Sequence, residues 1–494
     1  MHDMDGIDAL LRILTRMKRM GWQEMQKEDI WNHPTPKYMT PEALPSIRQA
    51  LAESKLCMAA LNEISLNVGT RIRNLQKGSA AAVLEEGIKL LPDEILGHIF
   101  AMAHLMSDHR GFAQRVSRVS RRFREVSLRA PILWTRLSAH FPDSQVQAFI
   151  SRSGQLDLEV STYVPGSGPA KVETFLQTLG KHTTRWARLF IHDAGAESII
   201  NELNFTDFPR LRFLYFSSSD VRKSEWATPV LSHIYALNWH ATPKVPFYSQ
   251  LTCVELSYED MYDMPIAKIT RALQCMTSLQ DLSLTIEECS SFSDESDESD
   301  DSDDSDEPVV MPHRHSVRIE DLHVTIKDGT THEVAEQVYD ILSYLIPTTL
   351  HIDLANLNTA DSSKFVVDSE GVMFPYASVI NIRISQVISS GNFPLLSSLL
   401  SNCDIAHTVN IEAPTETFID ESYHGHHWSS FAQLRNLRFK YCDSLSEAEV
   451  TQLVKNLVPE GKASRSLEII SCRGISEEFM SDLQDKGDKL VWKL

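Results

Sequence analysis

Histidine and acidic side chains gather at one point of the sequence where they could share a metal ion. His424, His426 and His427 lie within four residues, and Asp420 and Glu421 precede them. Imidazole nitrogens and carboxylate oxygens are zinc ligands, and histidines at this spacing can bind one ion. A polar loop between structural units has the same composition and is the simpler interpretation. We therefore predict no metal and no cofactor.

Residues for nucleophilic or nucleotide chemistry form no known motif. The chain has no G-x-S-x-G, no P-loop and no G-x-G-x-x-G. Its cysteines are scattered and form no C-x-x-C pair, so neither a zinc site nor a disulfide framework is supported. We expect reduced thiols that behave as small buried hydrophobic residues, no catalytic residue and no enzymatic activity. The seven cysteines are Cys57, Cys253, Cys275, Cys289, Cys403, Cys442 and Cys472.

A run of serines among acidic residues offers a third kind of chemistry, phosphorylation. Between Glu287 and Glu307 there are 12 acidic residues and no basic one. Such a run repels itself and lacks apolar side chains, so we predict a disordered acidic loop over 287–312. The loop is either a solvated spacer or a target of acidophilic kinases, whose phosphates would deepen its negative charge. The serines in question are Ser293, Ser296, Ser299, Ser302 and Ser305.

Length and charge narrow the class of protein. The chain has 494 residues, of which 42% are hydrophobic, so two or three globular domains are expected. The net charge is −20, and without the 12 acidic residues of the run the rest of the chain has a net charge of −8. This negative charge disfavours bulk binding to nucleic acid. No apolar run reaches membrane-spanning length, and the first residues show no signal-peptide pattern. We expect a cytoplasmic and/or nuclear protein without a membrane span.

Three short helices are predicted between Leu91 and Leu137. Pro92 suits the first position of a helix, and the apolar residues after it fall on one face. A second helix is predicted after a polar turn and carries Val116 and Val126 on one face. Pro131 opens a short third segment that contains Trp134. The apolar face of the first helix consists of Ile95, Leu96, Ile99, Phe100 and Ala103, and the second helix has Val116, Val119, Phe123 and Val126 at steps of three and four.

The order LPDEILGHIF, VSRVSRRFREV and APILWTRL resembles an F-box. The resemblance implies a module, over residues 88–140, that docks onto the Skp-type adaptor of a cullin–RING (SCF) ubiquitin ligase. Ser120 and Phe123 stand where the family often has Cys and Trp, and Gly111-Phe112-Ala113 replaces the usual leucine-rich start of the second helix. The resemblance assigns adaptor binding to Leu91, Pro92, Ile95, Leu96, Ile99, Phe100, Val116, Val119 and Trp134.

Seven arginines lie between Arg110 and Arg129. A nucleic-acid patch would need interleaved aromatic side chains, and only Phe112 and Phe123 are available. A solvated helix face is the first interpretation, and attraction to an acidic adaptor surface is the second.

Two helical patterns precede this module. Residues 5–20 predict an amphipathic helix that packs on the body of the protein or binds a membrane surface or partner, and a linker completes the segment 1–44. Residues 45–78 predict a long amphipathic helix, with Gly78 to Ala82 separating it from the F-box-like segment. This helix either forms a short coiled coil or packs against its own chain. A helix placed there is similar to what many F-box proteins of mushroom-type fungi show.

Short apolar strands recur after residue 150. Each resembles L-x-x-L-x-L, as in Leu251-x-x-Val254-x-Leu256, and intervals of roughly 25 to 40 residues favour a solenoid over an ordinary α/β domain. Two units near the end match at an offset of 30, since Leu437 and Cys442 correspond to Leu467 and Cys472. Ser446 with Glu449 forms a capping-box pattern. The other predicted strands centre on Leu214, Leu282, Leu322, Ile382, Leu437 and Leu467.

The predicted fold class is therefore α+β or α/β: a helical N-terminal region with a three-helix F-box, then an irregular leucine-rich-repeat solenoid over 150–494. The expected function is that of a substrate-recognition subunit of an SCF-type ligase, whose repeats bind a protein target. The alternative is an interaction scaffold in which the F-box-like helices cap the solenoid. Exposure separates the two, because a cap would bury all of Ile95, Leu96, Ile99 and Phe100, whereas a docking module would leave part of that set exposed.

Overall fold

The computed structural model forms two compact units, Met1–Ile99 and Phe100–Leu494. The predicted helix over 5–20, the serines of the acidic run and the histidines around His426 lie outside the described residues, apart from Leu11 and Thr15. The described residues are 11, 15, 44–107, 109–165, 169–192, 194–217, 226–240, 245–290, 312–357, 362–385, 395–416, 418, 433–457, 466–484 and 490–493. Among them, no helix is both long enough and apolar enough to cross a membrane.

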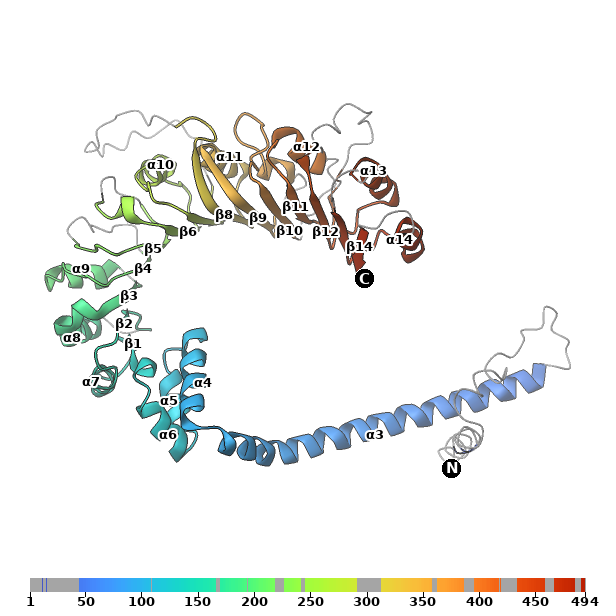
Figure 1. Ribbon diagram of the computed structural model, residues 1–494, viewed down its shortest axis with the longest axis horizontal. Helices are drawn as coiled ribbons and strands as arrows, with labels where there is room; N and C mark the ends of the chain where they lie inside the picture. The colour runs from blue at the N-terminus through green and yellow to red at the C-terminus, as the bar shows by residue number, and fades with distance from the viewer. Residues whose placement is uncertain are drawn as a thin grey trace. The chain divides into compact units, whose positions relative to one another are not determined.

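The first unit is dominated by one long helix, α3 (Leu44–Leu90), seen in blue in Figure 1. The prediction of a break at Gly78 to Ala82 was wrong, because the helix continues through these residues. Three consecutive alanines favour a helix, and one interior glycine costs only about 1 kcal/mol. Many large apolar side chains of α3 are exposed rather than packed on the first unit, among them Leu51, Met58, Leu61, Ile64, Leu66, Val68, Ile72 and Leu75.

The F-box-like segment contains four short helical elements instead of three. They are α4 (Asp93–Met106), α5 (Phe112–Ser117), α6 (Arg121–Leu128) and the 3-10 helix η1 (Pro131–Trp134). The predicted second helix is interrupted, because Ser120 has extended backbone angles (φ −156°, ψ 169°). Its hydroxyl accepts a hydrogen bond from the Phe123 N–H at 3.1 Å, which starts a new helix at Arg121.

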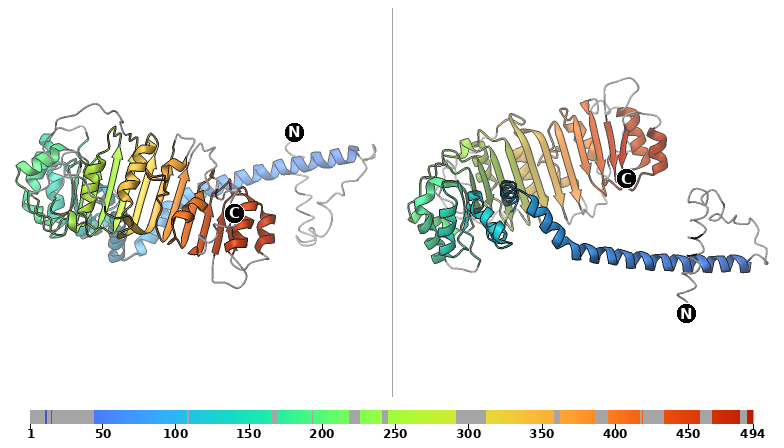
Figure 2. Two further views of the ribbon diagram at one scale, coloured as in Figure 1. Left: turned by 90° about the horizontal axis from the view of Figure 1, so that it is seen from above. Right: turned by 60° about the horizontal axis from the view of Figure 1, so that its bottom comes forward.

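A parallel sheet of fourteen strands follows, and each strand pairs with its neighbours in chain order. Figures 1 and 2 show helices α7 to α14 along one side of the sheet. The other side, which none of these described helices covers, is called the open side below. The strands are β1 (Arg136–Ser138), β2 (Leu158–Ser161), β3 (Trp186–Ile191), β4 (Phe213–Ser217), β5 (His233–Leu237), β6 (Cys253–Glu259), β7 (Asp281–Glu287), β8 (Val317–Lys327), β9 (Leu345–Ala355), β10 (Val379–Ser385), β11 (Thr408–Glu412), β12 (Asn436–Lys440), β13 (Ser466–Ile470) and β14 (Leu490–Lys493).

Helices and short turns connect these strands. They are α7 (Asp143–Arg152), α8 (Pro169–Leu179), η2 (Gly180–Arg185), α9 (Ala194–Glu202), η3 (Tyr248–Gln250), α10 (Ile266–Gln274), α11 (His332–Leu342), η4 (Ser362–Phe365), α12 (Leu395–Asn402), α13 (Glu447–Leu457) and α14 (Glu477–Gln484). Parallel strands need such crossovers, because a tight hairpin can join only antiparallel strands.

The offset of 30 residues found in the sequence corresponds to the register in which β12 and β13 pair. Leu437 pairs with Leu467 and Phe439 with Ile469, so corresponding residues lie side by side. The predicted capping box is confirmed: the Glu449 N–H donates to the Ser446 hydroxyl at 3.2 Å, and the Ser446 N–H donates to the Glu449 carboxylate at 2.9 Å. Equivalent residues of neighbouring strands are separated by 20 to 40 positions elsewhere, from His233 and Cys253 at one extreme to Asp281 and Asp321 at the other.

The turns after the strands also repeat. The residue that follows six of the strands has φ between 49° and 57°, and these residues are Asn238, Asp260, Glu288, Asn356, Tyr441 and Ser471. Cysteine occupies the next position after three of these turns, at Cys289, Cys442 and Cys472, and is buried there. The Cys289 thiol donates to the Tyr258 carbonyl at 3.5 Å and the Cys442 thiol to the Ile411 carbonyl at 3.4 Å. These cysteines therefore help to join successive turns.

The boundary predicted for the acidic loop was wrong at its start. Glu287 belongs to β7 and pairs in register with Glu259, and its carboxylate lies 2.7 Å from the Lys327 ammonium. Cys289 is buried, so residues 287–290 are part of the ordered sheet edge. The prediction was wrong because it rested on acidity alone, whereas the Glu287 carboxylate has a basic partner, Lys327, on the neighbouring strand β8.

Candidate functional site

An apolar stripe runs along the exposed side of α4. Ile95, Ile99 and Met102 are 49%, 45% and 46% exposed, and Met106 continues the series. These residues are separated by steps of four, three and four, so they lie on one face of the helix. The exposed side of a surface helix is normally polar, and an apolar stripe there marks an interaction surface.

The opposite side of α4 faces the interior. Leu96, Phe100 and His104 are buried, and the Phe100 ring lies 4.9 Å from the ring of Phe123. Burial lowers the pKa of His104 to about 4, and the positive charge of Arg136 adds to this effect. His104 is therefore neutral at pH 7. Both sides of α4 carry apolar residues, but only one of them is covered.

Trp134 packs in the interior of the domain and does not contribute to the exposed stripe of α4. It is fully buried, its indole N–H donates to the Ser127 carbonyl at 2.9 Å, and its ring packs edge-on against Phe149 at 4.9 Å. The Arg152 guanidinium lies 4.5 Å from the centre of the same ring. The assignment of Trp134 to direct adaptor contact does not fit this burial, since no surface of the side chain remains available.

The other residues assigned to adaptor binding differ in exposure. Pro92 and Val119 are exposed, whereas Leu91 and Val116 are half-buried. Val119 lies in the turn between α5 and α6, where the predicted helix breaks. The nine predicted residues therefore fall into three groups by exposure. They are exposed (Pro92, Ile95, Ile99 and Val119), half-buried (Leu91 and Val116) or buried (Leu96, Phe100 and Trp134).

Exposed arginines give a positive charge to α5, to α6 and to the turn between them. Arg115, Arg118, Arg121 and Arg124 are exposed on α5, α6 and the turn between them. Arg110 is partly buried and lies 3.2 Å from the His192 ring nitrogen, so it belongs to a different environment. The exposed arginines give this region a basic surface beside apolar Val119.

The open side of the sheet presents a second surface, with aromatic side chains over its first strands. Phe190, Phe213, Tyr215 and Tyr235 are half-buried there, and the rings of Tyr215 and Tyr235 stack at 5.2 Å. The Arg188 guanidinium lies 4.4 Å from the centre of the Phe213 ring. Aromatic residues and arginine are enriched at the energetic centres of protein interfaces.

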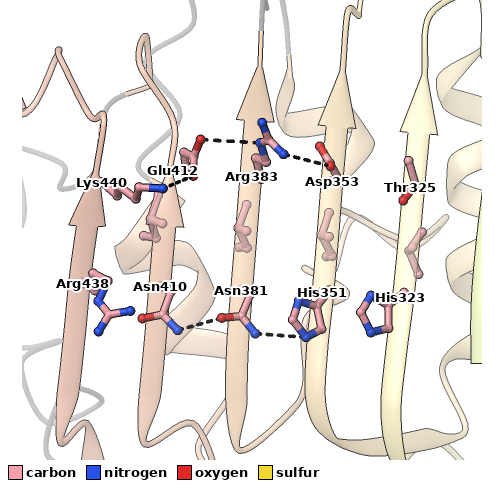
Figure 3. Close-up of a pocket in the computed structure, with 14 residues that line it drawn as sticks. His323, Thr325, His351, Asp353, Asn381, Arg383, Asn410, Glu412, Arg438 and Lys440 are labelled. Carbon is pink, nitrogen blue, oxygen red and sulfur yellow. Dashed lines mark hydrogen bonds and ion pairs between the residues drawn. The ribbon is translucent and has the colours of Figure 1, made fainter. Parts of the chain in front are cut away.

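The later strands carry a polar groove of about 390 Å3 instead (Figure 3). One row of side chains begins with His323, whose ring stacks on His351 at 4.1 Å, and continues through hydrogen bonds from Asn381 to His351 and from Asn410 to Asn381. These residues occupy matching register positions on β8 to β11. Burial lowers the pKa of His351, and the neighbouring His323 lowers it further, which favours the neutral form of the His351 ring.

A second row of the groove alternates in charge. The Arg383 guanidinium lies 3.9 Å from the Asp353 carboxylate and 3.5 Å from that of Glu412. Glu412 also lies 3.7 Å from the Lys440 ammonium, as Figure 3 shows. The ion pairs hold these side chains in place. Because the side chains are also partly exposed, their hydrogen-bond donors and acceptors remain accessible to a partner. The groove therefore suits a polar segment of a protein partner.

Sequence reasoning missed the residues of this groove. They occupy the variable positions of the L-x-x-L-x-L pattern, which the prediction used only to locate strands. The signal was the alternation itself, because every second residue of a strand covered on one face points to the open side. Which of those residues lie side by side on neighbouring strands depends on the register of the strands. The register could not be predicted from the sequence because the connecting segments differ in length.

Comparison with known proteins identifies one domain. Residues 88–140 match the family model described as F-box-like. A comparison with curated proteins found no match to the chain. The chain thus contains an F-box-like domain, followed by a region of parallel strands and helices. An F-box-like domain suggests a role in protein interaction, with partners such as Skp-type adaptors.

Proposed function

We propose that this chain is a non-enzymatic substrate-recognition subunit of an SCF-type cullin–RING ubiquitin ligase. The F-box-like domain would bind a Skp-type adaptor, and the sheet region would hold a protein target near the catalytic subunits. The mechanism is positioning, since tethering raises the effective concentration of the target at the ligase. Such a complex would operate in the cytoplasm and/or nucleus.

The observation that carries this proposal is the unequal exposure of α4. Leu96 and Phe100 are buried, while Ile95 and Ile99 are about half exposed. A helix that only capped the sheet would bury all four residues. The exposed stripe instead leaves apolar area for a partner, and burying one such side chain contributes about 1.5–3 kcal/mol. This supports docking over the alternative scaffold function.

The basic surface supports the same assignment. Arg118 and Arg121 flank exposed Val119, which places positive charge next to apolar residues of the F-box-like domain. Complementary charge steers association and selects partners more than it adds affinity. An acidic surface on the adaptor would therefore match this region.

Target recognition is assigned to the open side of the sheet, and we propose that the sheet region is an irregular leucine-rich-repeat solenoid. The support is the chain-order pairing of parallel strands together with the recurring left-handed turn after them. Aromatic side chains would supply contact area, and the polar groove would supply hydrogen-bond specificity. The acidic serine-rich segment is retained as a proposed site of phosphorylation.

The long helix α3 supports a further element of the proposal, a short parallel coiled coil with a second copy of the chain. Leu51, Met58, Leu61, Val68 and Ile72 are exposed and fall at the a and d positions of consecutive heptads, and Leu75 continues the series. A second copy is the fitting partner because its identical helix would present the same stripe in the same register.

Photo-cross-linking tests the adaptor docking. A photoreactive phenylalanine analogue is placed in the full-length chain at Met102, on the exposed stripe of α4. A matched chain carries the analogue at Val230, which has similar exposure on the sheet region. We expect the purified Skp-type adaptor to cross-link only to the Met102 chain. Equal cross-linking at both sites, or none at Met102, would argue against the proposal.

A further inference from the structure

Three different metal-binding groups meet on the open side of the sheet, between its aromatic and polar parts. His233 of β5 pairs in register with Cys253 of β6, and Glu255 lies two residues further along β6 on the same face. Their ligand atoms all lie within 4.8 Å of one another, and the His233 Nε2 and Glu255 Oε1 atoms are 2.7 Å apart. All three side chains are half-buried.

The backbone holds these groups firmly. The His233 N–H donates to the Arg212 carbonyl and the Cys253 N–H to the Ser232 carbonyl, each at 3.0 Å. The Phe213 ring packs edge-on against the His233 ring at 4.7 Å, which limits its rotation. Ligands on paired strands keep their positions better than ligands on loops, so this cluster is preorganised.

We propose that His233, Cys253 and Glu255 bind a zinc-type divalent ion. An imidazole nitrogen, a thiolate and a carboxylate oxygen are the ligand types that zinc prefers, and the two anionic groups balance its charge. Tetrahedral zinc places its ligand atoms roughly 3–4 Å apart, and the ligand atoms of this cluster lie within 4.8 Å of one another. Three protein ligands leave the fourth position for water on the open side of the sheet. Adaptor docking uses none of these residues, so the site goes beyond the proposed function.

The sequence concealed this site because its ligands come from two strands. Cys253 and Glu255 form only a short C-x-E pattern, and His233 lies 22 residues before Glu255. Without the register of β5 and β6, the pattern has no metal-site spacing. Cys253 also differs from the buried cysteines after the strands, because its thiol lies on the open face.

Cobalt titration of the full-length chain tests the proposal. After treatment with a chelator, the protein is titrated with Co²⁺, whose bond to a thiolate produces a charge-transfer absorption band. We expect one equivalent of Co²⁺ per chain, a thiolate band, and displacement of Co²⁺ by Zn²⁺. Cys253→Ser should abolish the band, and Glu255→Gln should weaken Co²⁺ binding by at least about tenfold. Circular dichroism checks that both variants keep the fold.

Two controls separate this site from other ligands of the chain. Cys275 is exposed, and Cys275→Ser should leave the band unchanged. A variant with His424, His426 and His427 all replaced by alanine should also keep the band, since the proposed site does not include them. The proposal is overturned if wild-type protein shows no thiolate band, if Cys253→Ser retains it, or if either control loses it.

Discussion

Ile95 and Leu96 are neighbours in α4 and have opposite environments: Ile95 is 49% exposed and Leu96 is 3% exposed. Consecutive residues of a helix differ in direction by about 100°, so a partly covered helix can bury one and expose the other. Both side chains are nonetheless apolar. The buried one is explained by the fold of the domain, and the exposed one fits the adaptor-binding surface that we propose.

Removal of the Trp134 side chain should destabilise the F-box-like domain. Trp134→Ala leaves a cavity beside Phe149 and is expected to cost about 3–5 kcal/mol, whereas Trp134→Phe should cost about 1–2 kcal/mol through the lost indole hydrogen bond. Hydrogen exchange of α6 amides measures the loss. Tyr262→Ala is the control because Tyr262 is exposed, and it should change stability by less than about 0.5 kcal/mol. Similar effects of Trp134→Ala and Tyr262→Ala would contradict this role.

The stability of α4 should depend on pH through His104. Its pKa is lowered to about 4 in the folded chain, against 6.5 in the unfolded chain. The unfolded chain therefore binds the proton first, so stability is complete above about pH 6.5 and falls as the pH drops towards 4. Hydrogen exchange of α4 amides at pH 7 and pH 5, corrected for intrinsic rates, measures this fall. His104→Leu should reduce the difference between the two pH values; an unchanged difference would assign it to other groups.

Charge reversal on the basic surface should slow association with the adaptor. For Arg118→Glu with Arg121→Glu, we expect the association rate to fall by about tenfold or more at low salt and the salt dependence to weaken, with little change in dissociation rate. Surface plasmon resonance at several salt concentrations measures both rates. The control, Lys181→Glu with Lys268→Glu, makes the same change in net charge on exposed residues elsewhere. If the control slows association equally, the effect reflects net charge and not this surface.

Pairing of α3 should be sensitive to the heptad positions. Leu61→Glu with Val68→Glu places charge in the proposed seam and should convert a dimer to a monomer in sedimentation experiments on the full-length chain. Asn67→Glu with Thr70→Glu adds the same charge outside the seam and should leave the dimer intact. A wild-type chain that remains monomeric at all concentrations would rule out pairing with a second copy.

The sequence predicted the elements that repeat most regularly. The strands at Leu214, Leu282 and Leu437 follow from their apolar alternation, and the capping box of Ser446 follows from local hydrogen-bond geometry. The strands β1, β2, β3, β5, β9, β11 and β14 escaped prediction, although the same alternation is present in β5, β9 and β11. Trp186 and Ala236, for example, occupy strand positions where the pattern expects a large aliphatic residue, and both are buried.

The candidate sites were less predictable because they depend on register and exposure. The family resemblance placed Ile99 and Phe100 in one functional set, and only the structure separated the exposed residue from the buried one. Asn381 and Asn410 form a hydrogen-bonded row because β10 and β11 align them, which no local pattern encodes. Ser120 departs from the family pattern, and its hydroxyl caps α6 instead.

The affinity of the full-length chain for a purified Skp-type adaptor tests the central claim most directly. Isothermal titration compares wild type, Ile95→Asp with Ile99→Asp, and the control Val230→Asp, whose native side chain is equally exposed. We predict tight binding by wild type and Val230→Asp, and at least about a hundredfold weaker binding by the α4 variant, because two apolar side chains lose their burial. No binding by wild type, or equal affinity of all three proteins, would contradict the account.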